Sequence, residues 1–301
     1  MIWNGSFFTT KPATAESFPW LKAVRGCSPT DKNFLAALAG WMLKEKRERG
    51  HNRLFVLGVN GSIGSGKTTF CRALARVLNR QLKRSEGQAL TRSLDDYYFP
   101  KSERSKPEFL ARGYDPQGIS NRGPAGTHDT RRLGADIHAF ETSTPKSRFS
   151  LPIFDKQRDD RSSRSFQFLG KVGIFILEGW FVGAETRVKW AKAPLGLKRS
   201  VAVALKDYRP IFKRLDALWV FETPPVSQIT AQRMEQQKTL NRRSRRTGMS
   251  LRQIRRFIRY FYQEAWQPGV TSPRPPAQDI SFLARIDRHH RFLSLRAGAQ
   301  V

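Results

Sequence analysis

The feature that most constrains the fold is a glycine-rich loop between an apolar run and an amphipathic run. The loop is Gly61-Ser62-Ile63-Gly64-Ser65-Gly66-Lys67-Thr68-Thr69, which contains the pattern G-x-x-x-x-G-K-[ST]. Residues 54–59 before it are apolar, as in a buried parallel strand, and residues 68–78 after it carry large apolar side chains four residues apart. A strand, a tight loop and a helix in this order predict an α/β fold with a parallel sheet.

The same loop indicates a ligand chemistry. Backbone N–H groups in a glycine-rich turn can surround anionic oxygens, because no Cβ atom blocks their approach. Lys67 can then reach the β- and γ-phosphates of a nucleotide, and the Thr68 hydroxyl can hold Mg²⁺. We therefore predict that residues 61–69 bind nucleotide phosphates; the alternative is a glycine-rich turn without a ligand.

Acidic residues follow two further strand candidates. Residues 89–94 end at Asp95 and Asp96, and the apolar run 172–177 ends at Glu178. The carboxyl ends of parallel strands meet at one edge of the sheet, where ligands bind in such folds. These carboxylates are therefore expected beside the glycine-rich loop.

Each carboxylate has a predicted role in phosphoryl transfer. Asp95 is the preferred base, because a carboxylate can accept the proton or the hydrogen bond of an attacking hydroxyl, and Asp96 is its competitor. Glu178 is expected to act with Thr68 at the metal, and Lys67 to be catalytic as well as phosphate-binding. The structural alternative for Asp95 and Asp96 is a helix N-cap with charge in the first turn.

The remaining pattern predicts a three-layer fold, a central and mostly parallel sheet with helices on both faces and a small helical lid. Further strand candidates are residues 218–221 and 280–286, and residues 100–130 are a long loop candidate. Residues 1–50 are expected to be a helical extension packed on a single domain of residues 51–301.

The predicted lid covers about residues 227–250. It contains a basic helix, in which Arg233 and Arg242 are candidates to reach the phosphates. A second helix is predicted from Met249 to Trp266, with Ser250 as its cap. A solvated basic face is the alternative for each of these arginines.

The chain has 301 residues, with 54 Lys and Arg against 25 Asp and Glu and a net charge of +29. A nucleic-acid partner and an arginine-rich enzyme for anionic substrates both fit this surplus. Because the charge is spread along the chain, the enzyme is favoured, with only non-specific binding of nucleic acid at low salt.

The two cysteines cannot form a disulfide framework, and no apolar run approaches the roughly 18 residues of a membrane span. A signal-peptide pattern is also absent, so we expect a cytoplasmic protein with no membrane segment.

Several segments together resemble a known enzyme family. Ser93-Leu94-Asp95-Asp96-Tyr97-Tyr98 resembles the strand-end motif of the phosphoribulokinase/uridine kinase superfamily of P-loop kinases. The runs R-G-P-A-G-T-H-D at residues 122–129, L-P-I-F-D-K at 151–156 and I-L-E-G-W-F at 176–181 are more specifically similar to plant-type D-glycerate 3-kinases and their bacterial and fungal relatives. The resemblance extends from about Leu54 to Ile286.

The resemblance implies ATP, Mg²⁺ and a small acceptor with a primary hydroxyl, and it places the catalytic base at Asp95. The acceptor carboxylate of D-glycerate needs cationic or hydrogen-bonding partners. The matching positions are Tyr98, Arg122, His128, Asp129, Lys156 and Arg161. The chain departs from the family pattern at Ala125, Ala202, Gln232 and Gln237, which leaves the loop and Asp95 intact.

We therefore predict an ATP-dependent kinase that phosphorylates a small hydroxy acid, with D-glycerate at its 3-hydroxyl as the leading acceptor. One alternative is a kinase for another small alcohol, such as a nucleoside or a pantothenate-like molecule. The other is a P-loop NTPase associated with nucleic acid, although no nucleic-acid recognition motif is present among those expected.

Overall fold

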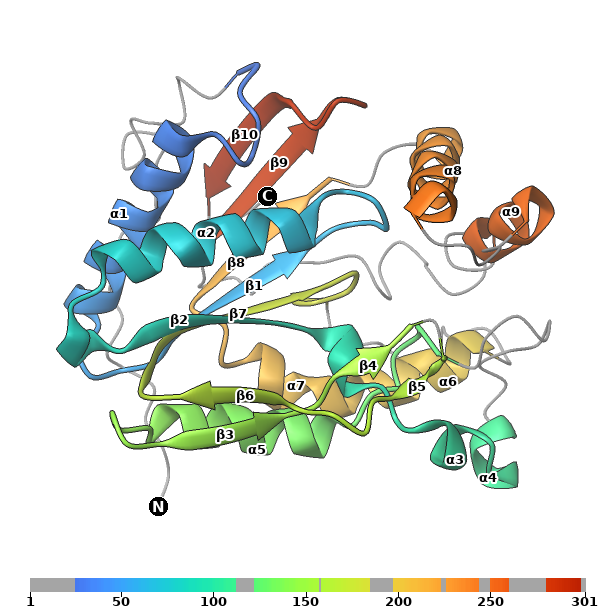
Figure 1. Cartoon of the computed structure of the whole chain (residues 1–301), viewed down its shortest axis with the longest axis horizontal. Helices are drawn as coiled ribbons and strands as arrows, with labels where there is room; N and C mark the ends of the chain where they lie inside the picture. Colours follow the sequence, from blue (N-terminus) through green and yellow to red (C-terminus); the bar gives the residue numbers. More distant parts are fainter. Residues whose placement is uncertain are drawn as a thin grey trace.

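The computed structural model describes residues 25–111, 122–156, 158–184, 197–222, 226–243, 250–259 and 280–298. A six-stranded sheet lies at its centre, in the order β10-β9-β8-β1-β7-β2 (Figure 1). All neighbouring strands are parallel except the β9–β10 pair, which is antiparallel. The strands are β1 (Phe55–Asn60), β2 (Gln88–Ser93), β7 (Val172–Gly179), β8 (Ala217–Phe221), β9 (Ile280–Ile286) and β10 (Phe292–Gly298).

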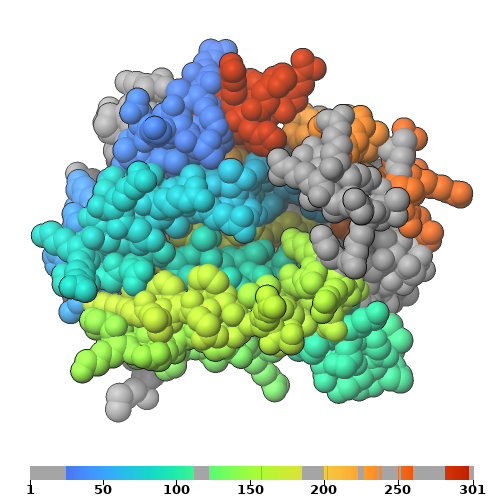
Figure 2. All heavy atoms as spheres, viewed as in Figure 1, coloured from blue at the N-terminus to red at the C-terminus, as the bar shows by residue number. Residues whose placement is uncertain are grey.

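Helices cover both faces of this sheet, and the predicted three-layer α/β fold is confirmed. The helices α1 (Lys32–Glu48) and α2 (Lys67–Gln81) lie on one face. The helices α5 (Thr130–Glu141), α6 (Leu197–Ala204) and α7 (Arg209–Phe212) lie on the other. The ribbon of β3 (Arg148–Leu151) and β6 (Phe166–Leu169) runs beside α5, and the space-filling view shows it below the central sheet layer (Figure 2).

The two cores follow from the two-residue period of the strands. Phe55, Leu57 and Val59 of β1 pack into the cluster under α1 and α2, and Leu54 and Val56 pack into the opposite cluster. Every residue of β1, β7 and β8 is buried. This double burial explains why the central strands are continuously apolar in sequence.

The helix α1 shares one core with α2 and the sheet. Asp31 caps it, since its carboxylate accepts from the backbone N–H groups of Asn33 and Phe34 at 3.0 and 3.1 Å. Leu38 and Met42 on its inner face are fully buried. The division of the chain at residue 50 stays a prediction.

Two helices lie beyond the carboxyl ends of the strands, α8 (Val226–Arg243) and α9 (Leu251–Arg259) (Figure 1). They pack on each other through Ile229, Ile254 and Ile258. The predicted cap of α9 is present, because the Ser250 hydroxyl accepts from the Gln253 N–H at 3.2 Å. The part of this predicted helix after Arg259 lies outside the described residues.

Several elements were not predicted from sequence: α5, β10, the β3–β6 ribbon and a short hairpin of β4 (Phe154–Asp155) and β5 (Asp160–Arg161). The long loop expected at residues 100–130 contains two short helices, α3 (Lys101–Arg104) and α4 (Pro107–Leu110), and residues 112–121 lie outside the described part. Among the helices described, none combines the length and apolar character needed to span a bilayer.

Candidate active site

The glycine-rich loop joins β1 to α2 at the carboxyl edge of the sheet. Gly61 is required there, because an added Cβ would lie 2.7 Å from Ser65 Oγ and 2.9 Å from Phe221 Cβ. No side chain caps the N-terminus of α2 at Gly66. The first N–H groups of a helix have no partner within the helix, so this end of α2 is suited to an anion.

Two side-chain hydroxyls of the loop are buried without a partner in the described structure, although other groups of the loop are paired. The Ser62 and Ser65 hydroxyls are buried and have no hydrogen-bond partner among the described residues. Lys67 Nζ donates to the Ser62 carbonyl at 2.9 Å. Burial lowers the pKa of Lys67, and the carboxylates of Glu178 and Asp95 oppose this shift. An anion in the loop would supply what these groups lack.

The two residues predicted at the metal lie in contact. Thr68 Oγ1 donates to Glu178 Oε1 at 2.6 Å, and the Glu178 side chain is almost completely buried at the end of β7. A hydroxyl and a carboxylate are hard oxygen donors of the kind that Mg²⁺ prefers. The chemistry of this pair therefore fits a magnesium ion shared with nucleotide phosphates.

Asp95 lies at the end of β2, in a short 3-10 helix (Leu94–Tyr97) capped by the Ser93 hydroxyl. The neighbouring carboxylate of Asp96 makes structural contacts. It accepts a hydrogen bond from the Ser93 N–H at 3.2 Å and forms an ion pair with Arg92 at 3.0 Å. The N-cap alternative thus describes Ser93 and Asp96, while Asp95 remains available to a ligand.

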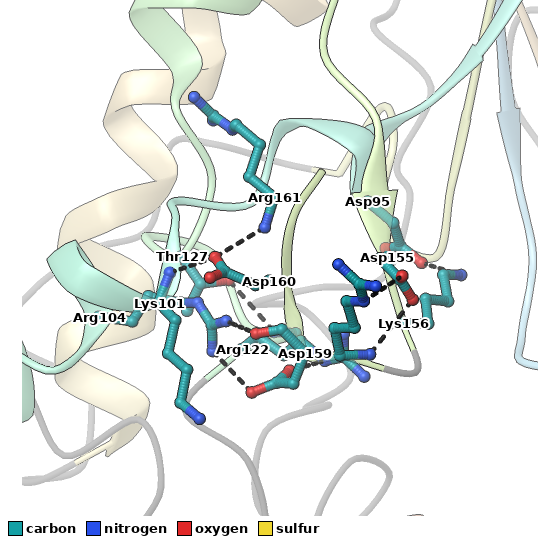
Figure 3. A network of polar contacts seen from close by, with 12 residues as sticks. Asp95, Lys101, Arg104, Arg122, Thr127, Asp155, Lys156, Asp159, Asp160 and Arg161 are labelled. Atoms are coloured by element: carbon teal, nitrogen blue, oxygen red, sulfur yellow. Dashed lines mark hydrogen bonds and ion pairs between the residues drawn. The ribbon is translucent and has the colours of Figure 1, made fainter. Parts of the chain in front are cut away.

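The partner of Asp95 is Lys156, whose Nζ lies 2.6 Å from Asp95 Oδ2 (Figure 3). Burial would raise the pKa of Asp95, but the Lys156 ammonium and a hydrogen bond from Tyr98 outweigh it and hold this pKa well below its usual range. Asp95 is 24% exposed and Lys156 is 63% exposed. Asp95 is therefore an ionised carboxylate, and its exposed partner Lys156 can move away to bind another anion.

His128 lies near Asp95, and aromatic neighbours hold its ring in place. Its ring stacks on Tyr98 with centroids 4.3 Å apart, and Nδ1 shares a hydrogen bond of 2.7 Å with the Tyr208 hydroxyl. Burial lowers the pKa of His128 to about 3, so the ring is neutral at physiological pH. His128 Nε2 is buried without a partner in the described part of the chain.

Asp159 holds the β4–β5 hairpin, which carries Lys156, in place through ion pairs with two arginines. Its carboxylate lies 3.0 Å from Arg122 Nε and 3.2 Å from Arg104 Nη1, and Figure 3 shows Asp159 beside Arg122. The Arg122 guanidinium stands over the Phe154 ring, 4.9 Å from its centroid. Asp159 and Arg104 were not among the predicted residues, because nothing in their spacing links them to Arg122.

Two other predicted acceptor-site residues are engaged in structural contacts. Asp129 caps α5 by accepting from the Arg132 N–H at 3.0 Å. Arg161 donates to the Tyr98 carbonyl at 2.9 Å and lies 3.6 Å from the Asp129 carboxylate. These contacts hold the backbone of the motif.

The predicted lid arginines are less closely defined. Arg233 is partly buried in α8, and this burial lowers its pKa. Arg242 lies in the last turn of α8, and its side chain falls outside the described part. Neither contacts the loop in the interactions described, and their role stays a prediction.

No protein-family model matches the chain. In sequence, it is 29% identical over 235 residues to mug58, an uncharacterized kinase of Schizosaccharomyces pombe, across 72% of this chain and 82% of mug58.

Two solved structures resemble the whole fold. The YGR205w protein matches with a TM-score of 0.70 and 21% identity, over 90% of this chain and 98% of that one. The D-glycerate 3-kinase of Cryptococcus neoformans matches with a TM-score of 0.63 and 23% identity, over 87% and 98%. The chain has the fold of a P-loop kinase. The predicted resemblance to these kinases is confirmed, and kinase activity of the P-loop superfamily is supported.

Proposed function

We propose that the chain is an ATP-dependent kinase that transfers the γ-phosphoryl group to a hydroxyl of a small hydroxy acid. The leading acceptor is D-glycerate, which would become 3-phosphoglycerate. The observation that carries the proposal is the contact between Lys156 and Asp95 at 2.6 Å, beside a phosphate-binding loop. It joins a base for a hydroxyl to a cation for a carboxylate.

In the proposed reaction the acceptor hydroxyl donates to Asp95 and attacks the γ-phosphorus of ATP. A new oxygen–phosphorus bond forms, the bond from the γ-phosphorus to the β–γ bridging oxygen breaks, and the hydroxyl proton passes to Asp95. Because its pKa is low, Asp95 is ionised in the free enzyme and takes the proton late, as the hydroxyl oxygen loses electron density to phosphorus. Lys67 stabilises the charge that develops on the phosphates.

Thr68 and Glu178 would hold Mg²⁺ through oxygen atoms. The ion, when bound, neutralises charge on the β- and γ-phosphates. The loop residues from Gly61 to Thr69 bind the phosphates in this proposal, and Arg233 and Arg242 of α8 cover them when the lid closes. Closure would exclude water, which otherwise competes with the acceptor.

Lys156 selects the acceptor in this account. Its side chain is mostly exposed and already pairs with a carboxylate, so the carboxylate of an acceptor can take its place beside the ammonium. The Asp95 oxygen released in this exchange accepts from the acceptor hydroxyl. Arg122 and the neutral His128 ring are further hydrogen-bonding groups for the acceptor in this proposal. Tyr98 orients Asp95 through a hydrogen bond.

An acceptor panel tests the proposal. Purified protein with ATP and Mg²⁺ is given D-glycerate, other hydroxy acids, uridine, pantothenate or DNA, and ADP is measured above the rate without acceptor. Stimulation by D-glycerate supports the proposal, and ³¹P NMR identifies the phosphorylated position. Stimulation by uridine or pantothenate alone favours another small alcohol, and stimulation by DNA alone favours a nucleic-acid-associated NTPase; either contradicts the hydroxy-acid assignment.

A substitution sharpens the acceptor assignment. Lys156→Met should raise the KM for D-glycerate about tenfold or more, since a charged hydrogen bond is lost, and leave the KM for ATP nearly unchanged. Lys146→Met is the matched control, because Lys146 is also exposed and lies in the loop before β3. Equal KM values in both variants would remove Lys156 from the acceptor site.

A further inference from the structure

The turn between β9 and β10 contacts the phosphate loop. His290 Nε2 lies 2.8 Å from the carbonyl oxygen of Gly64, 226 residues away in sequence. Since a carbonyl oxygen only accepts, Nε2 carries the hydrogen and donates it. The contact is possible because β9 is parallel to β8, so its carboxyl end lies at the same edge of the sheet as the loop.

The turn holds His290 in an uncommon conformation. His290 has φ of +57°, in the left-handed region that only a few per cent of residues other than glycine adopt. The Asp287 carboxylate fixes the turn by accepting from the N–H groups of His289 and Arg291, both at 2.8 Å. The backbone is therefore held in the geometry that brings the imidazole ring onto the loop.

The ring also packs against the start of α2. A Cβ added to Gly66, whose φ is +82°, would lie 3.2 Å from His290 Cδ2. On the other side of the Gly64–Ser65 peptide, the Ser65 N–H donates to the Ser62 carbonyl at 3.2 Å. The peptide plane is thus held from both ends, by His290 at its carbonyl and by Ser62 at its N–H group.

We propose that His290 is a positioning residue for nucleotide binding: it fixes the Gly64–Ser65 peptide so that the phosphate loop is formed before the nucleotide arrives. The proposal rests on the proposed function only in that the loop binds ATP. A loop that is already ordered loses less conformational freedom on binding, which increases affinity. His290 touches the loop carbonyl and not the reacting atoms, so its effect falls on binding.

The test is the Kd of the full-length protein for Mg·ADP and Mg·ATP, measured by titration calorimetry. His290→Asn is the main variant, because asparagine tolerates the left-handed backbone but its amide is too short to replace the ring. We expect Kd to rise about five- to tenfold, the effect of one lost hydrogen bond, with kcat at saturating ATP and the acceptor KM within about twofold. His290→Gln, which carries an amide donor on a longer side chain, should recover part of the affinity.

His289→Ala is the matched control, because His289 occupies the same turn, is exposed, and its Nε2 accepts a hydrogen bond from Arg288 Nε at 3.0 Å rather than contacting the loop. It should bind nucleotide like wild type. Wild-type affinity in His290→Asn, or an equal loss in His289→Ala, would overturn the proposal. If wild type binds nucleotide but phosphorylates no acceptor, the proposed function fails while the comparison of Kd values still decides the role of His290.

Discussion

The two edges of the central sheet differ in how completely their buried polar groups are paired. At the amino edge, the side chains of Lys46, Glu86 and Asp216 are almost completely buried, and each has at least two partners. At the carboxyl edge, Ser62 and Ser65 have buried hydroxyls without partners in the described chain. Buried polar groups usually have a hydrogen-bond partner, so these two hydroxyls favour the proposal that a ligand completes the carboxyl edge.

The amino edge is a closed network between α1 and the strand ends. Asp216, just before β8, receives Arg49 at 3.0 Å, Arg53 at 2.6 Å and the Val56 N–H at 2.8 Å. Lys46 donates to the carbonyls of His51 and Arg53 at 2.7 and 2.9 Å. Each of these buried charged groups has partners among the described residues, so the network contributes to stability.

The largest effect is expected at the carboxyl edge. Lys67→Ala should lower kcat about 10³-fold, equivalent to about 4 kcal/mol, because the proposed reaction loses the cation that stabilises charge on the transferring phosphoryl group. Its free energy of unfolding should stay close to wild type, since Lys67 gains only one hydrogen bond in the fold while burial opposes its charge. Steady-state kinetics and urea unfolding on the same sample measure both. A variant with normal kcat would break the comparison.

The reverse is expected at the amino edge. Asp216→Ala should lower the free energy of unfolding by about 3 kcal/mol, because it leaves the buried Val56 N–H unpaired and two arginines without their carboxylate. Asp216→Asn should lose less, since its amide oxygen can still accept from Val56. Urea unfolding gives the stabilities, and kcat at a temperature where the variants are folded should remain that of wild type. A loss of kcat without a loss of stability would contradict the structural role of this edge.

Acid should weaken the amino edge through Glu86. Arg47 donates two hydrogen bonds to the Glu86 carboxylate. They lower the pKa of Glu86 to about 2, although burial of the carboxylate acts in the opposite direction. A folded-state pKa below the unfolded value means that the stabilisation is complete above about pH 4.5 and is lost as the pH falls toward 2. Glu86→Gln should therefore be about 2 kcal/mol less stable than wild type at pH 7, allowing for partial exposure of Arg47. The difference should shrink at pH 3; a constant difference would exclude this titration as its source.

The smallest effect on stability is expected for a group without a partner. Ser65→Ala removes a buried hydroxyl that makes no hydrogen bond among the described residues, so the free energy of unfolding should stay within about 0.5 kcal/mol of wild type. Affinity for Mg·ATP should nevertheless fall several-fold if the hydroxyl meets a phosphate. Thermal unfolding and nucleotide titration separate the two effects. Clear destabilisation without loss of affinity would show that Ser65 belongs to the fold and not to the site.

Local patterns explain what could be predicted from sequence. The apolar run of β1, the glycine-rich loop and the start of α2 are contiguous, so their order reveals both the strand and the phosphate cradle. Asp95 and Glu178 were placed at one edge because each lies at the carboxyl end of a strand of the parallel sheet. The helix α5 was missed although it has a usable signal, an Asp129 cap followed by buried Leu133, Ile137 and Phe140.

Contacts between distant segments explain most of what could not be predicted. Lys156 meets Asp95 across 61 residues, and only the fold of the β4–β5 hairpin brings them together. His290 meets Gly64 through a turn whose left-handed residue is a histidine rather than the usual glycine. The β3–β6 ribbon was missed because each strand has only four residues, so its apolar alternation is too short to stand out, and most of its side chains are exposed or half-buried.

The central claim is that Asp95 accepts the proton of a hydroxy acid phosphorylated by ATP. The most direct measurement is the initial rate of ADP release with and without D-glycerate, for wild type and Asp95→Asn. Asparagine keeps the size of the side chain and removes the base, so we predict stimulation by D-glycerate in wild type and a loss of about 10²–10⁴-fold in the variant, with nucleotide affinity unchanged. Stimulation of the same size in Asp95→Asn would contradict the account.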